Sequence, residues 1–166
     1  MLTKNIVFKN FRNSKVSLKV KKNLKNLLKE NNQVIESLKN TYKNRYDFKK
    51  IIKFKKKLNI RIIGIGGSIL GAKAIYNFLS VKKKIYFIDN LKSRYYLKRK
   101  KYLNLIISKS GNTLETITNA NILLSKRDKN IFITENKKSY LYSLAESLKS
   151  EVIHHNNYIG GRYSVL

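Results

Sequence analysis

The fold is decided by residues 60–71, which read Ile-Arg-Ile-Ile-Gly-Ile-Gly-Gly-Ser-Ile-Leu-Gly. The run begins with β-branched residues that favour a buried strand, and it passes into glycines that allow a sharp turn. After the turn, Ser68 is a residue type that can cap a helix, and we expect this helix to continue to Ser80. A strand, a glycine-rich turn and a helix in this order are typical of the first unit of an α/β domain.

The same alternation of strand and helix continues through residues 59–166. Because the apolar runs are short, β-rich and continuous, they fit a parallel sheet that is buried on both faces. We therefore expect an α/β domain in which a parallel β-sheet is flanked by helices on both faces. The predicted strands are Ile60–Ile65, Ile85–Ile88, Leu103–Ile107, Ile131–Ile133 and Val152–Ile153, and the predicted helices are Ser68–Ser80, Lys92–Lys100, Asn112–Lys126 and Ser139–Lys149.

Residues 1–58 differ in kind and predict a mainly helical amino-terminal segment. A second helix is expected at Asp47–Lys57. A basic amphipathic helix can bind a membrane surface or a partner groove, but packing on its own domain is the simpler interpretation. The residues at helical spacing are Leu24, Leu27, Leu28, Val34, Ile35, Leu38 and Tyr42.

The chain is strongly basic, with 37 Lys and Arg residues against 9 Asp and Glu residues and a net charge of +28. Such a charge can indicate a nucleic-acid or anionic-membrane partner. However, the lysines are spread along the chain, and the enriched residue types are those with A/T-rich codons. We therefore attribute the charge to base composition and expect no specific nucleic-acid partner and no membrane association.

Two other features of the composition limit the function. The absence of cysteine excludes disulfides, thiolate nucleophiles and zinc–thiolate sites. Lysines interrupt every apolar stretch near the amino terminus, so no signal peptide is visible, and the most apolar run, Ile62–Ala72, is too short to span a bilayer. We expect a cytoplasmic protein.

A second polar turn follows the predicted strand Leu103–Ile107: residues 108–116 read Ser-Lys-Ser-Gly-Asn-Thr-Leu-Glu-Thr. Four hydroxyls, an amide and a lysine at a strand-to-helix turn suit a phosphate dianion beside a positive helix end. The alternative is an ordinary Ser/Thr-rich helix cap, although a cap needs only one hydroxyl. Parallel strands place both turns at one sheet edge, so together they predict a phosphate pocket.

The glycine-rich turn does not match two common nucleotide-binding motifs. A dinucleotide fingerprint requires glycine where Ile69 stands, and a P-loop requires Lys followed by Ser or Thr after Gly71. Taken alone, this turn is a weak signal.

Three segments together resemble the phosphoglucose isomerase family. Residues 65–74 resemble its first glycine-rich loop, and residues 107–116 resemble its phosphate loop, with Asn112 where threonine is usual. Residues 160–166, Gly-Gly-Arg-Tyr-Ser-Val-Leu, are similar to a family signature segment. The three motifs occur in the family's order and cover the chain from about Arg61 to its end.

This resemblance implies an amino-terminal sugar isomerase (SIS) domain of an enzyme that interconverts glucose 6-phosphate and fructose 6-phosphate in glycolysis and gluconeogenesis. Members need no metal or organic cofactor, and the full-length enzyme is expected to be a homodimer. Arg162 would stabilise the enediolate, where a fixed guanidinium supplies positive charge as negative charge develops. By carry-over, the residues that would bind the hexose 6-phosphate are Gly67, Ser68, Ser108, Lys109, Ser110 and Thr113.

The family's carboxylate base, histidine and lysine lie beyond the Gly-Gly-Arg segment, whereas this sequence stops four residues after Arg162. We therefore expect a truncated member that is inactive alone, because proton transfer needs a positioned base. His154 and His155 match no family motif and are expected to be structural or loop histidines. The alternatives are a stand-alone SIS-type sugar-phosphate-binding or regulatory module and a basic nucleic-acid-binding protein.

Overall fold

The computed structural model describes residues 17–43, 47, 49, 59–91 and 100–160. The chain divides into two compact units, Met1–Tyr42 and Lys43–Leu166. Most of the predicted helices Asp47–Lys57 and Lys92–Lys100 lies outside the described residues, as does residue 58, the predicted end of the amino-terminal segment. No helix within the described ranges is long and apolar enough to cross a membrane.

Between residues 17 and 42 the first unit forms two helices, α1 (Leu18–Lys29) and α2 (Gln33–Ser37), so the prediction of helical structure is confirmed for this described part of residues 1–58. Each helix begins at a polar cap. Ser17 Oγ accepts a hydrogen bond from Val20 N at 3.2 Å, and Asn32 Oδ1 accepts one from Val34 N at 2.8 Å. The apolar periodicity is divided between two helices because the backbone is extended at Glu30 and Asn32 starts a new cap.

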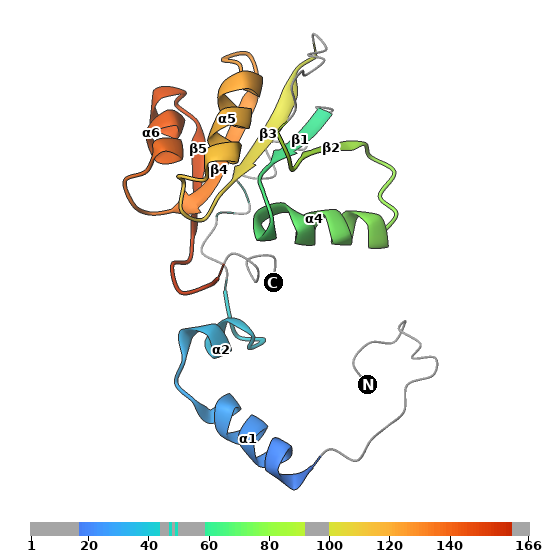
Figure 1. The fold of residues 1–166 in the computed structure, drawn as a ribbon, viewed down its shortest axis with the longest axis vertical. Coiled ribbons are helices and arrows are strands. Elements are labelled where there is room, and N and C mark those ends of the chain that lie inside the picture. Colours follow the sequence, from blue (N-terminus) through green and yellow to red (C-terminus); the bar gives the residue numbers. More distant parts are fainter. Residues whose placement is uncertain (1–16, 44–46, 48, 50–58, 92–99, 161–166) are drawn as a thin grey trace. The chain divides into compact units, whose positions relative to one another are not determined.

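The second unit is built on one sheet of five parallel strands in the order β2-β1-β3-β4-β5 (Figure 1). This confirms the predicted α/β fold with a parallel sheet. In the register, Ile63 at the end of β1 pairs with Ile88 of β2 and with Ile106 of β3, so these three strands end nearly level. The strands are β1 (Asn59–Ile63), β2 (Ile85–Ile88), β3 (Tyr102–Ile107), β4 (Lys129–Glu135) and β5 (Glu151–His155).

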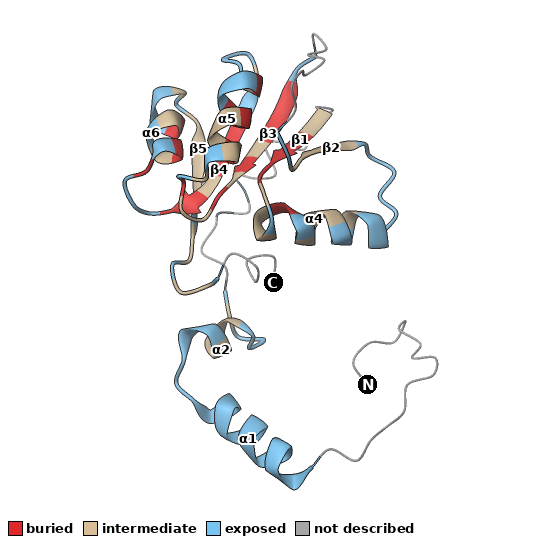
Figure 2. Cartoon of the chain, in the orientation of Figure 1, coloured by how far each residue is buried: buried red, intermediate tan, exposed pale blue. Residues whose placement is uncertain are grey.

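In the described connections, three helices link these strands: α4 (Gly67–Phe78), α5 (Leu114–Leu123) and α6 (Tyr140–Ser147). Successive strand residues point to opposite faces of a sheet. On β2, Ile88 packs against the core cluster that α5 and α6 cover, whereas the Phe87 ring meets the Tyr76 ring of α4 edge to face at 5.4 Å. Helices therefore contact both faces, as predicted. The buried core cluster, along the sheet and the inner sides of α5 and α6 (Figure 2), comprises Ile63, Ile106, Ala120, Leu123, Phe132, Leu141 and Ala145.

The boundaries differ from the prediction mainly at the polar turns. The first strand ends at Ile63 rather than Ile65, and the helix after it starts at Gly67. The expectation that Ser68 caps this helix is wrong, because Gly66 occupies the cap position and no side chain bonds to the helix start. Gly66 has φ +56° and ψ −128°, a conformation that glycine adopts without steric cost, so the turn depends on the glycine backbone.

Candidate functional site

The two polar turns lie at the carboxyl edge of the sheet, on neighbouring strands. The chain leaves β1 toward β2 on one side and leaves β3 toward β4 on the other. In open α/β sheets, ligands bind outside the carboxyl ends of the strands at such a switch point. The loop from Gly64 to Gly66 and the loop from Ser108 to Thr113 border this position.

Gly64 is the point where these two loops meet. A Cβ atom at Gly64 would lie 2.9 Å from the Ile107 carbonyl oxygen and 3.4 Å from Ser68 Cβ. The Gly64 amide donates a hydrogen bond to the Ile88 carbonyl at 3.1 Å, which fixes the start of the loop on β2. Any larger residue at Gly64 would push the Ser68 turn away from the end of β3.

Two hydroxyls of the loop after β3 face each other. Ser108 Oγ and Thr113 Oγ1 are 2.9 Å apart, and Ser108 is 2% exposed. The Gly111 amide donates to Ser108 Oγ at 3.2 Å, and the Asn112 amide donates to Ser110 Oγ at 3.2 Å. Thr113 occupies the cap position of α5, yet its side chain makes no capping bond. The alternative of an ordinary Ser/Thr cap therefore does not describe Thr113, whose hydroxyl pairs with Ser108.

Gly111 fixes the loop against the start of α6. Its φ of +69° lies in the left-handed region that favours glycine. A Cβ atom there would lie 2.7 Å from Ser139 Cβ and 2.8 Å from Thr134 Oγ1, and it would collide with Ser139 Oγ. The Gly111 carbonyl accepts a hydrogen bond from the Leu141 amide at 3.0 Å. The loop is thus held from two sides.

Lys109 extends away from this hydroxyl pair. Its ammonium donates to the Asn157 carbonyl at 2.8 Å and lies 3.5 Å from Glu135 Oε1. The other oxygen of Glu135 lies 2.5 Å from Lys137 Nζ, and this hydrogen bond lowers the pKa of the buried Glu135 carboxyl. The sequence reasoning did not single out Glu135. Glu135 could have been recognised in the sequence as an acidic residue two positions after the apolar run Ile131–Ile133, close to the carboxyl end of a predicted strand.

Comparison with known proteins decides the family. A family model described as phosphoglucose isomerase matches residues 4–166. This chain belongs to the phosphoglucose isomerase family. Glucose-6-phosphate isomerases from Methanocaldococcus jannaschii and Acholeplasma laidlawii are 37% and 38% identical to it over 121 and 131 residues, which is 64% of this chain in each case. The chain spans about 30% of the length of these curated relatives.

A solved structure shows the same fold. A hypothetical protein from Thermus thermophilus matches with a TM-score of 0.56 and 26% identity, over 64% of this chain and 30% of that one. The resemblance carried by the three sequence motifs is therefore confirmed at the level of the family.

In this phosphoglucose isomerase family member, the predicted site residues fall into three groups. Gly67 and Ser68 lie in the first turn of α4. The loop after β3 holds Ser108, Lys109, Ser110 and Thr113. Arg162 lies outside the described residues.

Both histidines lie within β5. His154 is exposed and stacks on the Tyr142 ring, with ring centroids 6.3 Å apart. His155 is half-buried, its Nδ1 lies 2.7 Å from the Asn156 carbonyl oxygen, and burial lowers the pKa of its imidazole. The role expected for these residues as structural histidines stays a prediction.

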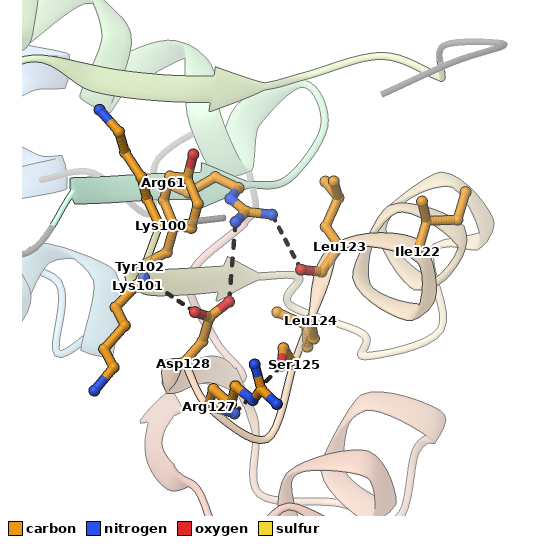
Figure 3. A pocket seen from close by; sticks show the side chains of 10 residues that line it. All are labelled: Arg61, Lys100, Lys101, Tyr102, Ile122, Leu123, Leu124, Ser125, Arg127 and Asp128. Atoms are coloured by element: carbon orange, nitrogen blue, oxygen red, sulfur yellow. Dashed lines mark hydrogen bonds and ion pairs between the residues drawn. The ribbon is translucent and has the colours of Figure 1, made fainter. Parts of the chain in front are cut away.

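A separate polar cluster lies at the opposite, amino edge of the sheet, beside a cavity of about 640 Å³ (Figure 3). Arg61 donates to the Leu123 carbonyl at 3.1 Å, lies 3.9 Å from Asp128 Oδ2 and stacks 3.9 Å above the Tyr102 ring. Burial lowers the pKa of the Arg61 guanidinium, and Asp128 opposes that shift. Asp128 also accepts hydrogen bonds from the Tyr102 amide and Asn104 Nδ2, at 3.0 and 3.2 Å. This cluster joins β1, β3 and the segment before β4, and it contains none of the predicted site residues.

Proposed function

We propose that this chain provides the phosphate-binding part of a glucose-6-phosphate isomerase, an enzyme that interconverts glucose 6-phosphate and fructose 6-phosphate. The observation that carries the proposal is the Ser108–Thr113 hydroxyl pair, 2.9 Å apart at the start of α5. Because the Thr113 side chain makes no capping bond to α5, the positive end of this helix is available to an anion as far as Thr113 is concerned. Membership of the family and the names of its curated relatives support the choice of a sugar phosphate.

In this proposal, the phosphate dianion accepts hydrogen bonds from the hydroxyls that now bond to one another. Ser108 and Thr113 rotate their hydroxyls toward the phosphate, and Ser110 joins them from the same loop. Ser68 and the backbone at Gly67 contact the sugar phosphate from the neighbouring turn. Hydrogen bonds to a charged group are stronger than those between neutral groups, so exchanging hydroxyl–hydroxyl bonds for hydroxyl–phosphate bonds is favourable.

The remaining parts of the proposal concern the reaction and the partners. Arg162 would stabilise the enediolate that forms between the first two sugar carbons. We expect the 166 residues to bind hexose 6-phosphate without isomerising it, since the family's general base matches no residue of this sequence. The complete enzyme would act as a cytoplasmic homodimer in glycolysis and gluconeogenesis. The side chain of Lys109, which the resemblance suggested as a phosphate ligand, is left out of this proposal, because its ammonium lies against Glu135 and Asn157.

The proposal is tested by replacing Ser110 and Thr113 together with alanine and titrating the chain with glucose 6-phosphate in a calorimeter. Each lost bond to a charged phosphate costs about 1.5–3 kcal/mol, so the affinity should fall by more than about tenfold. Thr118→Ala is the matched control, because the Thr118 hydroxyl on the same helix donates to the Leu114 carbonyl, at 2.9 Å, one turn into the helix.

Circular dichroism confirms that each variant is folded. Equal affinity in the double variant and the native chain would refute the assignment of this loop, and an absence of binding by the folded native chain would refute the proposed function. Conversion of fructose 6-phosphate by the native chain would show that a base has been overlooked.

A further inference from the structure

Lys109 is held at both of its ends. Its backbone carbonyl accepts hydrogen bonds from the Glu135 amide at 3.0 Å and from Thr134 Oγ1 at 3.3 Å. Its ammonium donates to the Asn157 carbonyl at 2.8 Å and pairs with the Glu135 carboxylate at 3.5 Å. One residue therefore joins the ends of three adjacent strands, β3, β4 and β5.

The direction of the Lys109 side chain separates it from the proposed phosphate position. The Ser68 turn follows β1, on one side of β3, whereas Asn157 follows β5, two strands away on the other side. Neighbouring strands are about 4.8 Å apart, so β5 lies about 10 Å from β3. Both partners of the Lys109 ammonium, Glu135 at the end of β4 and Asn157 after β5, belong to the side of β3 opposite to β1, so the ammonium points away from the turn that carries Ser68.

We propose that Lys109 is a positioning residue that fixes the segment Asn156–Gly160 at the carboxyl edge of the sheet, rather than a ligand of the phosphate. This rests on the proposed function, since it is the sugar-phosphate site that the segment would border. The segment forms a turn in which the Ile159 amide donates to the Asn156 carbonyl at 3.3 Å. In the sequence it leads directly into Gly160-Gly161-Arg162. The bond from Lys109 thus holds the last described residues before the glycine–arginine sequence.

Lys137 provides a matched control within the same ion-pair network. Both lysines neutralise Glu135, but Lys137 Nζ pairs with that carboxylate without reaching Asn157, and its side chain is 54% exposed against 27% for Lys109. A loss of charge at either position leaves Glu135 with one cation. Only a loss at Lys109 removes the bond to Asn157.

The experiment measures hydrogen exchange of the Ile159 amide, by NMR or in peptides that cover residues 156–160, in the Lys109→Met, Lys137→Met and Lys109→Arg variants. A hydrogen bond to a charged group stabilises by enough to change local opening about tenfold or more. We expect exchange to accelerate by about that factor in Lys109→Met, to stay within about twofold in Lys137→Met, and to be restored in Lys109→Arg.

A second readout is the titration of each variant with inorganic phosphate. A positioning residue leaves this affinity within about threefold of the native value, whereas loss of a direct charged ligand lowers it by more than about tenfold. Unchanged exchange in folded Lys109→Met overturns the proposal, and so does a loss of phosphate affinity that leaves exchange at the native rate. If the native chain binds neither phosphate nor glucose 6-phosphate, the proposed function fails. The exchange data then still show whether the bond from Lys109 to Asn157 fixes the segment Asn156–Gly160.

A further variant keeps the test possible if Lys109→Met does not fold. Removing one partner of a buried ion pair is strongly destabilising, whereas replacing both with apolar residues is often tolerated. If Lys109→Met does not fold, the double variant Lys109→Met with Glu135→Leu removes the tie without leaving a buried carboxylate that has lost one of its two cations. Native-like exchange at Ile159 in that double variant overturns the proposal equally.

Discussion

Replacement of Gly111 by alanine tests whether the loop Ser108–Thr113 after β3 is held as tightly as the structure indicates. The substitution adds one methyl group to a buried residue whose φ is +69°. That methyl carbon would lie 2.7 Å from Ser139 Cβ and 2.8 Å from Thr134 Oγ1, and both distances are shorter than van der Waals contact. Rotation of the Ser139 hydroxyl does not relieve the overlap, because Ser139 Cβ is attached directly to the backbone.

Three costs add to the expected loss of stability. A left-handed backbone costs an alanine about 1–2 kcal/mol, and overpacking of a buried position costs about 1–3 kcal/mol. Ser139 caps α6 by accepting a hydrogen bond from the Tyr142 amide, and disturbing such a cap costs about 1 kcal/mol. We therefore expect Gly111→Ala to reduce the free energy of unfolding by about 3–6 kcal/mol, a large part of a typical domain's stability.

Gly66→Ala separates the steric cost from the backbone cost. Gly66 also has a positive φ, +56°, but a Cβ atom there would meet nothing within 4 Å. Urea unfolding followed by circular dichroism should show Gly111→Ala to be less stable than Gly66→Ala by at least about 1–2 kcal/mol. If the two variants unfold at the same urea concentration with the same slope, the close approach of Gly111 to Ser139 is not present in solution.

Two further predictions concern stability. In the folded chain the pKa values of His155 and Glu135 lie below their ordinary values, because of burial and of the hydrogen bond from Lys137 respectively, so the unfolded chain takes up more protons as the pH falls. The contribution of His155 to stability should be fully present above the ordinary histidine pKa of 6.5 and should be lost as the pH drops below it. In His155→Gln, the urea concentration at the unfolding midpoint should therefore depend less on pH between about pH 7.5 and 5.5. Asp128→Ala should lower the free energy of unfolding by about 3–5 kcal/mol, since it leaves Arg61 as a buried unpaired charge, whereas exposed Arg127→Ala should change it by less than about 0.5 kcal/mol. A loss at Asp128 no larger than that at Arg127 would show that the amino-edge cluster does not hold the strands together.

Much of the fold could be predicted because its strands are apolar and its turns are not. Ile85–Ile88 was predicted with the bounds that the structure has, since Lys84 and Asp89 mark both ends. The fourth strand was predicted too short, because Thr134 and Glu135 are polar and yet continue the ladder opposite His154 and His155. Backbone pairing, which the side-chain pattern does not report, extends this strand.

The sequence predicted that the two polar turns share one edge of the sheet, but not the contacts within them. The first part is confirmed, because β1 and β3 are neighbouring parallel strands and each is followed by one of the turns. The Ser108–Thr113 pair and the absence of a cap bond from Thr113 depend on side-chain rotation, which spacing does not encode. The partners of Lys109 come from residues 26 and 48 positions later in the chain, so no local pattern could have identified them.

The two ends of β1 and β3 have separate tasks. Within the strands, Arg61 and Asn104 belong to the ionic cluster around Asp128, and after the carboxyl ends Gly64 and Ser108 begin the two polar turns. A strand rises about 3.3 Å per residue, so about 10–13 Å of rigid backbone separates the two groups on each strand. Substitutions that far apart and without shared partners usually contribute independently. We therefore expect a substitution in the cluster around Asp128 to change the stability of the domain while the two polar turns at the carboxyl edge keep their geometry.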